Sequence, residues 1–314
     1  MMEIILRFLL LVLGFVMLIK GADWLVDGAA GIAKRFGIPE IIVGLTVVAM
    51  GTSAPEAAVS ISSALKHNVD IAVGNVLGSN IINILVILGI TAIIYPIVIQ
   101  KETLFIDIPF VFLISCLLVF LGKDGILTKV DGIIFIVLFI TYLIYLILTA
   151  KKNKENETEK KGKESKEKTV LQLLFLFLIG IIVVVLGSNL TVDSATYIAK
   201  SVGLSERIIG LTIIALGTSL PELVTCIMAA RKKKPDLAIG NIVGSNIFNI
   251  LFVLGLTVFI TDVPYQSKFI LDGIYSLISI ALLFFGCVRL KKLTRIGGVV
   301  LVLAYLVYMF IFML

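Results

Sequence analysis

The sequence predicts an all-α integral membrane protein with ten transmembrane helices, arranged as two inverted five-helix repeats. First, 59% of its 314 residues are hydrophobic and only 15% are charged, with a mean hydropathy of +1.13. A soluble domain of this length could not bury so much apolar surface in one core. Second, charge-free stretches such as residues 71–100 and 237–261 exceed the roughly 20 residues that a membrane-spanning helix needs. Third, the second half of the chain repeats the first.

The repeat has a fixed offset of 166 residues. Without a gap, just over half of the positions from Ile42 to Thr91 are identical to those from Ile208 to Thr257. The segment KKNKENETEKKGKESKEK between the halves has no apolar residue to anchor it, so we expect a solvated, largely disordered cytoplasmic linker. The predicted organisation is a first repeat at residues 1–150, the linker at 151–168 and the second, inverted repeat at 169–314.

Each half contains five apolar segments. An odd number of spans per half means that the second copy enters the membrane from the opposite side. The first segment has no small-residue cleavage pattern, so we interpret it as a span and not as a signal peptide. The predicted spans are residues 4–32, 40–65, 71–99, 103–121, 131–150, 169–199, 207–230, 237–261, 267–288 and 297–314.

Basic residues predict the orientation, because they accumulate in cytoplasmic loops. If the N-terminus is outside, the inner loops contain the linker and basic clusters at residues 34–35, 231–234 and 289–295. We therefore expect a multi-pass protein of the cell membrane (plasma or inner membrane), with both termini extracytoplasmic. The net charge of +6 follows from this loop bias, so the lipid bilayer is the expected partner, with no nucleic acid and no obligatory protein partner evident.

Two polar motifs interrupt the second and seventh spans: GTSAPE at residues 51–56 and GTSLPE at 217–222. Proline removes a hydrogen bond to the carbonyl four residues earlier, so Pro55 should open its helix around residues 50–52. A carboxylate in mid-span costs at least a few kcal/mol unless a cation or a proton compensates its charge. Residues that share one helical face with the carboxylate are Ala49, Thr52, Ser53 and Glu56, and in the second half Ala215, Thr218, Ser219 and Glu222.

The third and eighth spans carry GNVLGSNIIN at residues 74–83 and GNIVGSNIFN at 240–249. A GxxxG pair in each motif should allow a second helix to approach closely. Polar side chains then line one face, namely Asn75, Ser79 and Asn83, and Asn241, Ser245 and Asn249. Taken singly, such residues more often form hydrogen bonds between helices.

Two mid-span carboxylates, hydroxyls, amides and opened carbonyls together form an all-oxygen cage, which is the ligand set of a hard cation such as Ca²⁺ or Na⁺. The three scattered cysteines form no CxxC pair, which disfavours a soft-metal site, and no cofactor is expected. Two carboxylates neutralise one Ca²⁺, two Na⁺ or two H⁺. Because one kind of ion excludes the other, the cage favours coupled antiport.

A second polar group lies in the first span at Lys20, Asp23 and Asp27, with Asn189 and Asp193 as its counterparts. We expect Lys20 to pair with Asp23. The remaining residues are assigned to an access path or to gating contacts.

The four motifs at one fixed offset resemble the two α-repeats of the cation/Ca²⁺ exchanger superfamily, specifically its small prokaryotic sodium/calcium exchangers. This resemblance covers all ten spans. It implies alternating access at a mid-membrane site built by the second, third, seventh and eighth helices, while the first and sixth slide as a gating pair. By motif, the implied ligands are the carbonyls of Ala49 and Ala215 and the side chains of Thr52, Ser53, Glu56, Ser79, Asn83, Thr218, Ser219, Glu222, Ser245 and Asn249.

The predicted function is therefore a secondary antiporter, not an enzyme, that exchanges Na⁺ for Ca²⁺ in the direction of Ca²⁺ extrusion. The resemblance implies independence from K⁺, because K⁺-dependent members have Asp where this chain has Asn249. The nearest alternative is Ca²⁺/H⁺ antiport through the same two glutamates. A channel would need a continuous pore, and an enzyme a catalytic motif such as HExxH; the sequence indicates neither.

Overall fold

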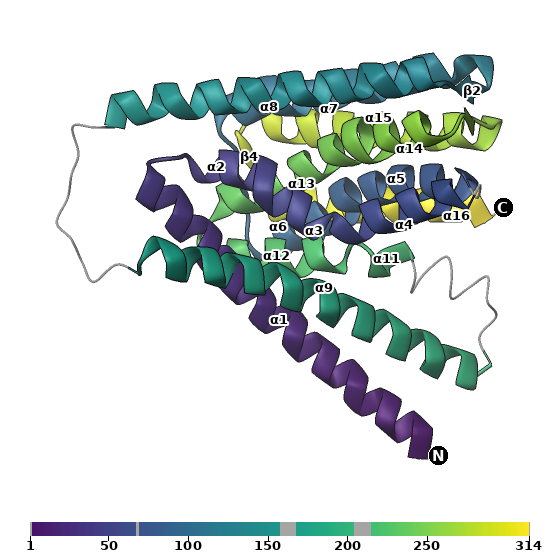
Figure 1. Cartoon of the computed structure of the whole chain (residues 1–314), viewed down its shortest axis with the longest axis horizontal. Helices are drawn as coiled ribbons and strands as arrows, with labels where there is room; N and C mark the ends of the chain where they lie inside the picture. Colours follow the sequence, from purple (N-terminus) through teal and green to yellow (C-terminus); the bar gives the residue numbers. More distant parts are fainter. Residues whose placement is uncertain (1, 67–68, 158–167, 204–214, 314) are drawn as a thin grey trace.

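The computed structural model describes residues 2–66, 69–157, 168–203 and 215–313. Helices account for nearly all of them (Figure 1). The first half contains α1 (Met2–Phe36), α2 (Glu40–Val43), η1 (Gly44–Val48), α3 (Ala49–Thr52), α4 (Ala54–Leu65), α5 (Val69–Ile82), η2 (Asn83–Leu88), α6 (Gly89–Ile94), β1 (Ile97–Val98), η3 (Thr103–Asp107), α7 (Ile108–Leu121), η4 (Gly122–Asp124), β2 (Ile126–Leu127) and α8 (Lys129–Glu157). The second half contains α9 (Val170–Ser201), α11 (Ala215–Gly217), α12 (Leu220–Arg231), α13 (Pro235–Ile247), η6 (Phe248–Leu254), α14 (Gly255–Ile260), β3 (Val263–Pro264), α15 (Ser267–Val288), β4 (Lys292–Leu293) and α16 (Arg295–Met313).

The helical membrane architecture predicted from the composition is present. Within the described residues, 7 helices are long and apolar enough to cross a membrane, or up to 8 if a bent pair is one span. Arg295–Ile311 in α16 is a shorter apolar helix, and residues 204–214, which belong to the predicted span 207–230, lie outside the described residues. The long helices are Glu3–Phe36, Val69–Ile94, Thr103–Asp124, Lys129–Lys152, Val170–Ser201, Pro235–Ile260 and Ser267–Val288.

Proline breaks the second span, as predicted. Glu40–Thr52 and Ala54–Leu65 meet at an angle of 50°. The break lies at Ser53, one residue later than the predicted interval, because Pro55 fits the first turn of a new helix, where its missing N–H has no partner to lose. In the second motif, α12 likewise begins directly after Ser219, and Pro221 lies in its first turn.

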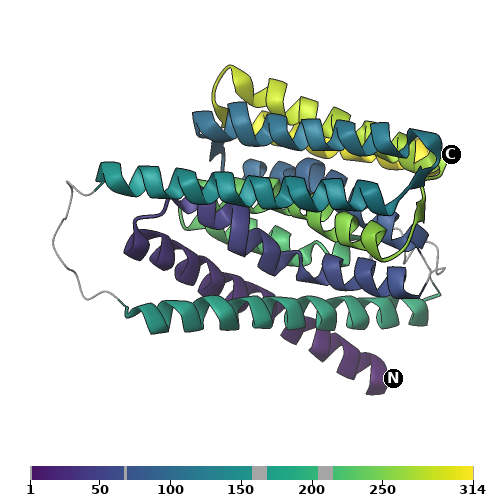
Figure 2. The same ribbon diagram turned by 45° about the horizontal axis from the view of Figure 1, so that its top comes forward.

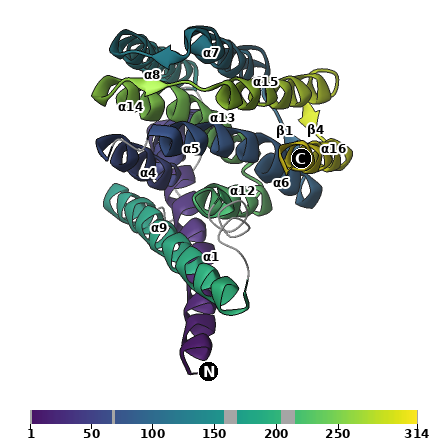
Figure 3. The same ribbon diagram turned by 90° about the vertical axis from the view of Figure 1, so that its right-hand side faces the viewer.

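The two spans that carry the GN motifs lie at the centre of the molecule. Viewed end on, α5 and α13 lie between α7 and α8 at one edge and α1 and α9 at the other (Figure 3). They belong to the two most buried of the long helices, Val69–Ile94 and Pro235–Ile260. The outer helices α1, α8 and α9 instead expose many Leu, Ile, Val and Phe side chains, as expected of helices facing lipid.

Helices α1 and α9 form a crossed pair on one side of the molecule (Figure 2). They approach at backbone distance, since a Cβ atom on Gly180 would lie 2.5 Å from the Leu25 nitrogen. Leu18, Ala22 and Val184 pack with α12 as a small apolar group separate from the main core. Only the part of α1 from Leu25 onward joins that main core.

The two GxxxG pairs differ in their surroundings. A Cβ on Gly244 would lie 2.5 Å from the Leu45 carbonyl oxygen, and one on Gly240 would lie 2.7 Å from that of Ile41, which confirms the predicted close approach. At Gly74 the nearest described atom is 3.9 Å away, and at Gly78 none lies within 4 Å. Residues 207–211, which the offset would place there, lie outside the described residues.

The short strands follow the internal repeat. Strand β1 pairs antiparallel with β4, and β2 pairs antiparallel with β3. A shift of 166 residues turns Ile97 into Val263 and Ile126 into Lys292, so each pairing is the counterpart of the other. The contacts between the two halves are therefore reciprocal at these strands.

Helix α8 continues to Glu157, past the predicted end of the first repeat at residue 150. The beginning of the predicted linker is therefore helical, because Lys and Glu are strong helix formers. The predicted disorder of the rest cannot be compared with residues 158–167, which lie outside the described residues.

Candidate cation site

The two helix breaks bring Glu56 and Glu222 together through crossed hydrogen bonds. Ser53 Oγ donates to Glu222 Oε1 at 2.7 Å, and Ser219 Oγ donates to Glu56 Oε1 at 3.3 Å. Each serine lies at the break before its own glutamate and binds the carboxylate of the other half. The two glutamates, 1% and 0% exposed, are buried at one place.

The neighbouring spans complete the surroundings. Thr52 Oγ1 lies 3.0 Å from Asn241 Oδ1, 3.1 Å from the Val48 carbonyl oxygen and 3.3 Å from that of Ala49, so its proton has three acceptors within reach. Ser245 Oγ lies 3.5 Å from Glu222 Oε1, at the limit of hydrogen bonding. Thr52, Ser53, Ser219 and Ser245 are all buried.

Asn75 and Asn241 hold neighbouring helices. Asn75 Nδ2 donates to the Glu56 carbonyl oxygen at 3.1 Å and to Ser60 Oγ at 3.0 Å. Its counterpart Asn241 Nδ2 lies 3.6 Å from Cys226 Sγ. Both amides thus join the helix after the break to the following span, the interhelical role that polar residues most often have in membranes.

Four buried side-chain oxygens of the predicted ligands have no hydrogen-bond partner. They are one carboxylate oxygen from each glutamate and one amide oxygen from each of two asparagines, namely Glu56 Oε2, Glu222 Oε2, Asn83 Oδ1 and Asn249 Oδ1. In the described residues, the other buried side-chain atoms without a partner are all hydroxyls. Buried acceptors without donors are costly, and binding of a cation would offset that cost. The four atoms are hard oxygen donors, two from each half, which fits Ca²⁺ or Na⁺.

The other predicted ligands are placed less uniformly. Ser79 is buried, whereas Thr218 is only half-buried. Ala215 is the first residue of α11, and its side chain is not among those that the structure describes. The Ala49 carbonyl, a ligand implied by the resemblance, accepts the Ser53 N–H at 2.9 Å, because the helix continues to that residue.

The polar group in the first span is organised differently from the prediction. Asp23 pairs with Lys232 at 2.6 Å, and not with Lys20 as predicted; the same ammonium group lies 2.5 Å from Asp27. Lys232 follows α12, so the ion pairs join α1 to the other half. Sequence spacing could not show this partner, which is more than 200 residues away. Asn189 and Asp193 are exposed on α9.

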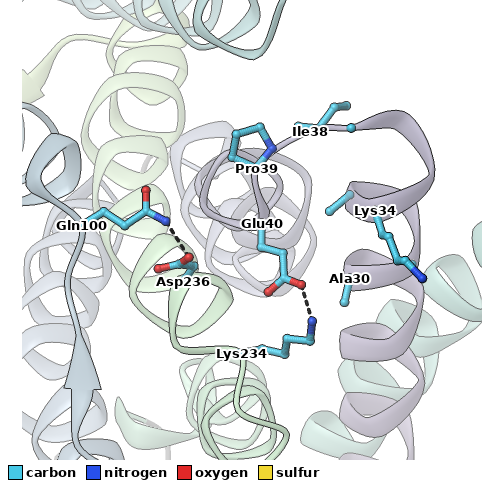
Figure 4. Close-up of a pocket in the computed structure, with 11 residues that line it drawn as sticks. Ala30, Lys34, Ile38, Pro39, Glu40, Gln100, Lys234 and Asp236 are labelled. Atoms are coloured by element: carbon cyan, nitrogen blue, oxygen red, sulfur yellow. Dashed lines mark hydrogen bonds and ion pairs between the residues drawn. The ribbon is translucent and has the colours of Figure 1, made fainter. Parts of the chain in front are cut away.

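An open pocket of about 850 Å³ lies at the end of α1 (Figure 4). Glu40 binds Lys234 there, and Gln100 Nε2 donates to Asp236 at 2.6 Å. None of the predicted ligands lines this pocket. The Gln100–Asp236 contact has a counterpart in Gln266 and Asp70, at 2.9 Å and at the same 166-residue offset.

Two further asparagines, Asn80 and Asn246, were not among the ligands predicted from the sequence. Each is fully buried and directly follows a predicted serine ligand. Asn80 Oδ1 accepts a hydrogen bond from Asn249 Nδ2 at 3.1 Å, and Asn246 Oδ1 accepts one from Asn83 Nδ2 at 3.0 Å. The sequence could have indicated both residues, because each occupies the same position in its GSN triplet.

Similarity to known proteins divides the chain into the same two halves as the internal repeat. A family model described as "Sodium/calcium exchanger protein" matches residues 6–148 and again residues 172–314. The chain belongs to the sodium/calcium exchanger family. The two starts and the two ends of these matches are each 166 residues apart, as expected for a duplicated exchanger unit. Members of this family are transporters, so the protein is not an enzyme.

Relatives from several organisms cover most of this exchanger. The putative antiporter CaxA of Alkalimonas amylolytica is 35% identical over 91% of this chain and 92% of its own length. The inner membrane protein YrbG of Escherichia coli K12 is 38% identical over 80% and 79%, respectively. The sodium/calcium exchanger MaX1 of Methanosarcina acetivorans is 32% identical over 98% of both chains.

A solved structure shares the fold. The sodium-calcium exchanger NCX_Mj, soaked with Na⁺ and Sr²⁺, superimposes with a TM-score of 0.84 at 32% sequence identity, over 98% of both chains. Together with the apolar helices, this match identifies the protein as a helical membrane antiporter with the fold of a small prokaryotic exchanger.

Proposed function

We propose that this protein is a secondary antiporter that exchanges Na⁺ for Ca²⁺ across the cell membrane, in the direction of Ca²⁺ extrusion and without K⁺. The observation that carries the proposal is the set of four unpartnered oxygens on Glu56, Glu222, Asn83 and Asn249. Two halves of the chain contribute equally to it. Family membership and the printed names of the relatives support the choice of ions.

Charge balance favours exchange over simple binding. The hydrogen-bond donors to the two carboxylates among the described residues are serine and threonine hydroxyls, which are neutral. One Ca²⁺ or two Na⁺ would balance both negative charges, and an empty cage would carry a large desolvation cost. The ions then compete for one site, which couples their gradients.

The proposed ligands are those that the motifs indicate, with Glu56 and Glu222 on Ca²⁺ and the hydroxyls and carbonyls completing the Na⁺ sites. The four unpartnered oxygens support the glutamates and Asn83 and Asn249 most directly. The full proposed set is Ala49, Thr52, Ser53, Glu56, Ser79, Asn83, Ala215, Thr218, Ser219, Glu222, Ser245 and Asn249.

We propose alternating access because the glutamate and asparagine oxygens are buried from solvent. An ion can reach them only after helices rearrange. The α1–α9 pair is a suitable moving part. Its two helices contact each other closely at glycines, and a small apolar group separate from the main core forms part of their contact with α12. The Lys232 ion pairs with Asp23 and Asp27 would hold one arrangement of this pair.

The proposed topology is ten spans in two inverted repeats, at residues 1–150 and 169–314, joined by the linker 151–168. Asp70 lies in the first turn of the span Val69–Ile94 and Gln100 follows its last turn, and each binds the other's counterpart from the second half: Asp70 binds Gln266, and Gln100 binds Asp236. Reciprocal contacts at opposite ends of one span support a two-fold axis in the membrane plane. In Figure 1, α1 starts and α16 ends at the same end of the molecule, which supports the placement of both termini on one side of the membrane.

The direct test uses the purified protein in vesicles with Ca²⁺ inside. An inward Na⁺ gradient, at equal pH on both sides and without K⁺, is expected to drive Ca²⁺ efflux. Efflux that requires a pH gradient and ignores Na⁺ would replace this proposal with Ca²⁺/H⁺ antiport. External Ca²⁺ should accelerate release of trapped Ca²⁺, because a carrier exchanges and a channel does not.

Asn249→Asp is expected to make Ca²⁺ flux sensitive to K⁺ or to pH. The substitution adds a third carboxylate beside the two glutamates, so a further cation or a proton is needed for charge balance. Flux is measured with and without K⁺ at several pH values, with the unmodified protein in parallel vesicles. Equal K⁺ and pH responses of the two proteins would contradict the proposed position of Asn249 at the ion.

A further inference from the structure

Four asparagines form a closed hydrogen-bond network where α5 and η2 meet α13 and η6. Asn80 Nδ2 donates to the Asn246 carbonyl oxygen and Asn246 Nδ2 donates to the Asn80 carbonyl oxygen, both at 3.3 Å. Asn83 Nδ2 then donates to Asn246 Oδ1, and Asn249 Nδ2 to Asn80 Oδ1. All four side chains are buried.

The backbone determines the orientation of each amide. A backbone carbonyl can only accept a hydrogen bond, so the group that Asn246 directs at the Asn80 carbonyl must be its NH₂. Asn246 Oδ1 is then left to accept, and the partner that faces it must present the NH₂ of Asn83. The Asn83 oxygen therefore points away from the network and has no partner.

The orientation of the Asn249 amide is determined in the same way, with the two halves exchanged. The Asn246 carbonyl fixes the NH₂ of Asn80, Asn80 Oδ1 fixes the NH₂ of Asn249, and Asn249 Oδ1 is left unpartnered. Each ligand of one half is thus oriented by an asparagine of the other half. Without such a partner, an amide can rotate by 180° and present a donor where the ion requires an acceptor.

We propose that Asn80 and Asn246 are positioning residues that hold the amide oxygens of Asn249 and Asn83, respectively, toward the transported cation. This inference rests on the proposed function, in which the two amide oxygens bind that cation. It assigns a specific pair to each asparagine: Asn80 acts on Asn249 alone, and Asn246 on Asn83 alone. A general packing role would not produce this specificity.

The test is a crossed rescue with aspartate. A carboxylate presents an oxygen in either orientation, so it needs no orienting partner. Asn80→Ala is expected to weaken Ca²⁺ binding about tenfold, the typical effect of one lost hydrogen bond that leaves a polar group unsatisfied. The same change made in an Asn249→Asp background should cause no loss of affinity, because the aspartate has no NH₂ group for Asn80 Oδ1 to orient, whereas in an Asn83→Asp background it should again cost about tenfold.

Asn246→Ala is the corresponding test in the other half. Asn83→Asp should remove the loss of Ca²⁺ affinity that this change causes, and Asn249→Asp should not. Ca²⁺ affinity of the purified full-length proteins is measured by calorimetry in Na⁺-free detergent solution, and each effect is taken as a ratio within one background. Asn80→Leu, which preserves side-chain volume, is made as a second variant in case the alanine variant does not fold. Its expected pattern of rescue is the same.

Equal losses in all three backgrounds would overturn the inference and leave Asn80 as a packing residue. Failure of the proposed function looks different: Asn83→Asp, Asn249→Asp and the glutamate variants would then each leave Ca²⁺ binding unchanged. A rescue of Asn80→Ala by both aspartates would also contradict the assignment, because added charge alone would explain it.

Discussion

Glu56→Gln and Glu222→Gln are each expected to lower Ca²⁺ flux at least about 100-fold while the protein stays folded. Glutamine has the shape of glutamate, but it removes a full negative charge from a buried site and places a donor beside the ion. Removing one partner of a buried charge pair costs about 3–5 kcal/mol, which corresponds to roughly two to four powers of ten in affinity. Flux is measured in vesicles with an imposed Na⁺ gradient.

The thermal stability of these variants should change in a characteristic way. A ligand stabilises the folded state that binds it, so Ca²⁺ should raise the Tm of the unmodified protein. Neither variant should show this Ca²⁺-dependent rise, although each folds. Glu102→Gln is the matched control, because Glu102 is exposed and should behave like the unmodified protein. Unchanged flux in both glutamate variants would remove the cation cage from the mechanism.

Gly244→Ala should have the second-largest effect, through the geometry of the site. The added Cβ would lie 2.5 Å from the Leu45 carbonyl oxygen and 2.7 Å from the Leu45 Cα, and backbone atoms cannot move aside as a flexible side chain can. Overpacking of this kind costs about 1–3 kcal/mol. Because η1 and α13 would separate, the Thr52–Asn241 contact should lengthen and Ca²⁺ flux should fall about tenfold or more.

Gly286→Ala provides the control, because no atom of the described residues lies within 4 Å of the position that a Cβ would occupy there in α15. Alanine favours a helix over glycine, so this variant should keep or slightly raise the Tm and retain its flux. Tm and flux are compared in the same detergent and lipid. If the two alanine variants behave alike, close approach at Gly244 is not required for transport.

The limits of two spans, the bend at Ser53 and the strand pairings follow from the sequence. The segments 40–65 and 267–288 begin and end where the structure has them, because a hydrocarbon core fixes the length of a spanning helix and charged residues mark its limits. The bend at Ser53 follows from proline chemistry, and the reciprocal strand pairs follow from the duplication. Helix α8 continues from the predicted span 131–150 to Glu157, since propensity carries a helix beyond its apolar part.

The sequence by itself determined the helical membrane fold, the internal repeat, the broken span and the residue types of the proposed hard-cation site. Tertiary structure alone decided the partners: Ser53 with Glu222, Asn80 with Asn249, and Lys232 in place of Lys20 at Asp23. The reason is physical. Helical periodicity shows which residues share a face of their own helix, whereas contacts between residues more than 160 positions apart depend on how the two halves pack.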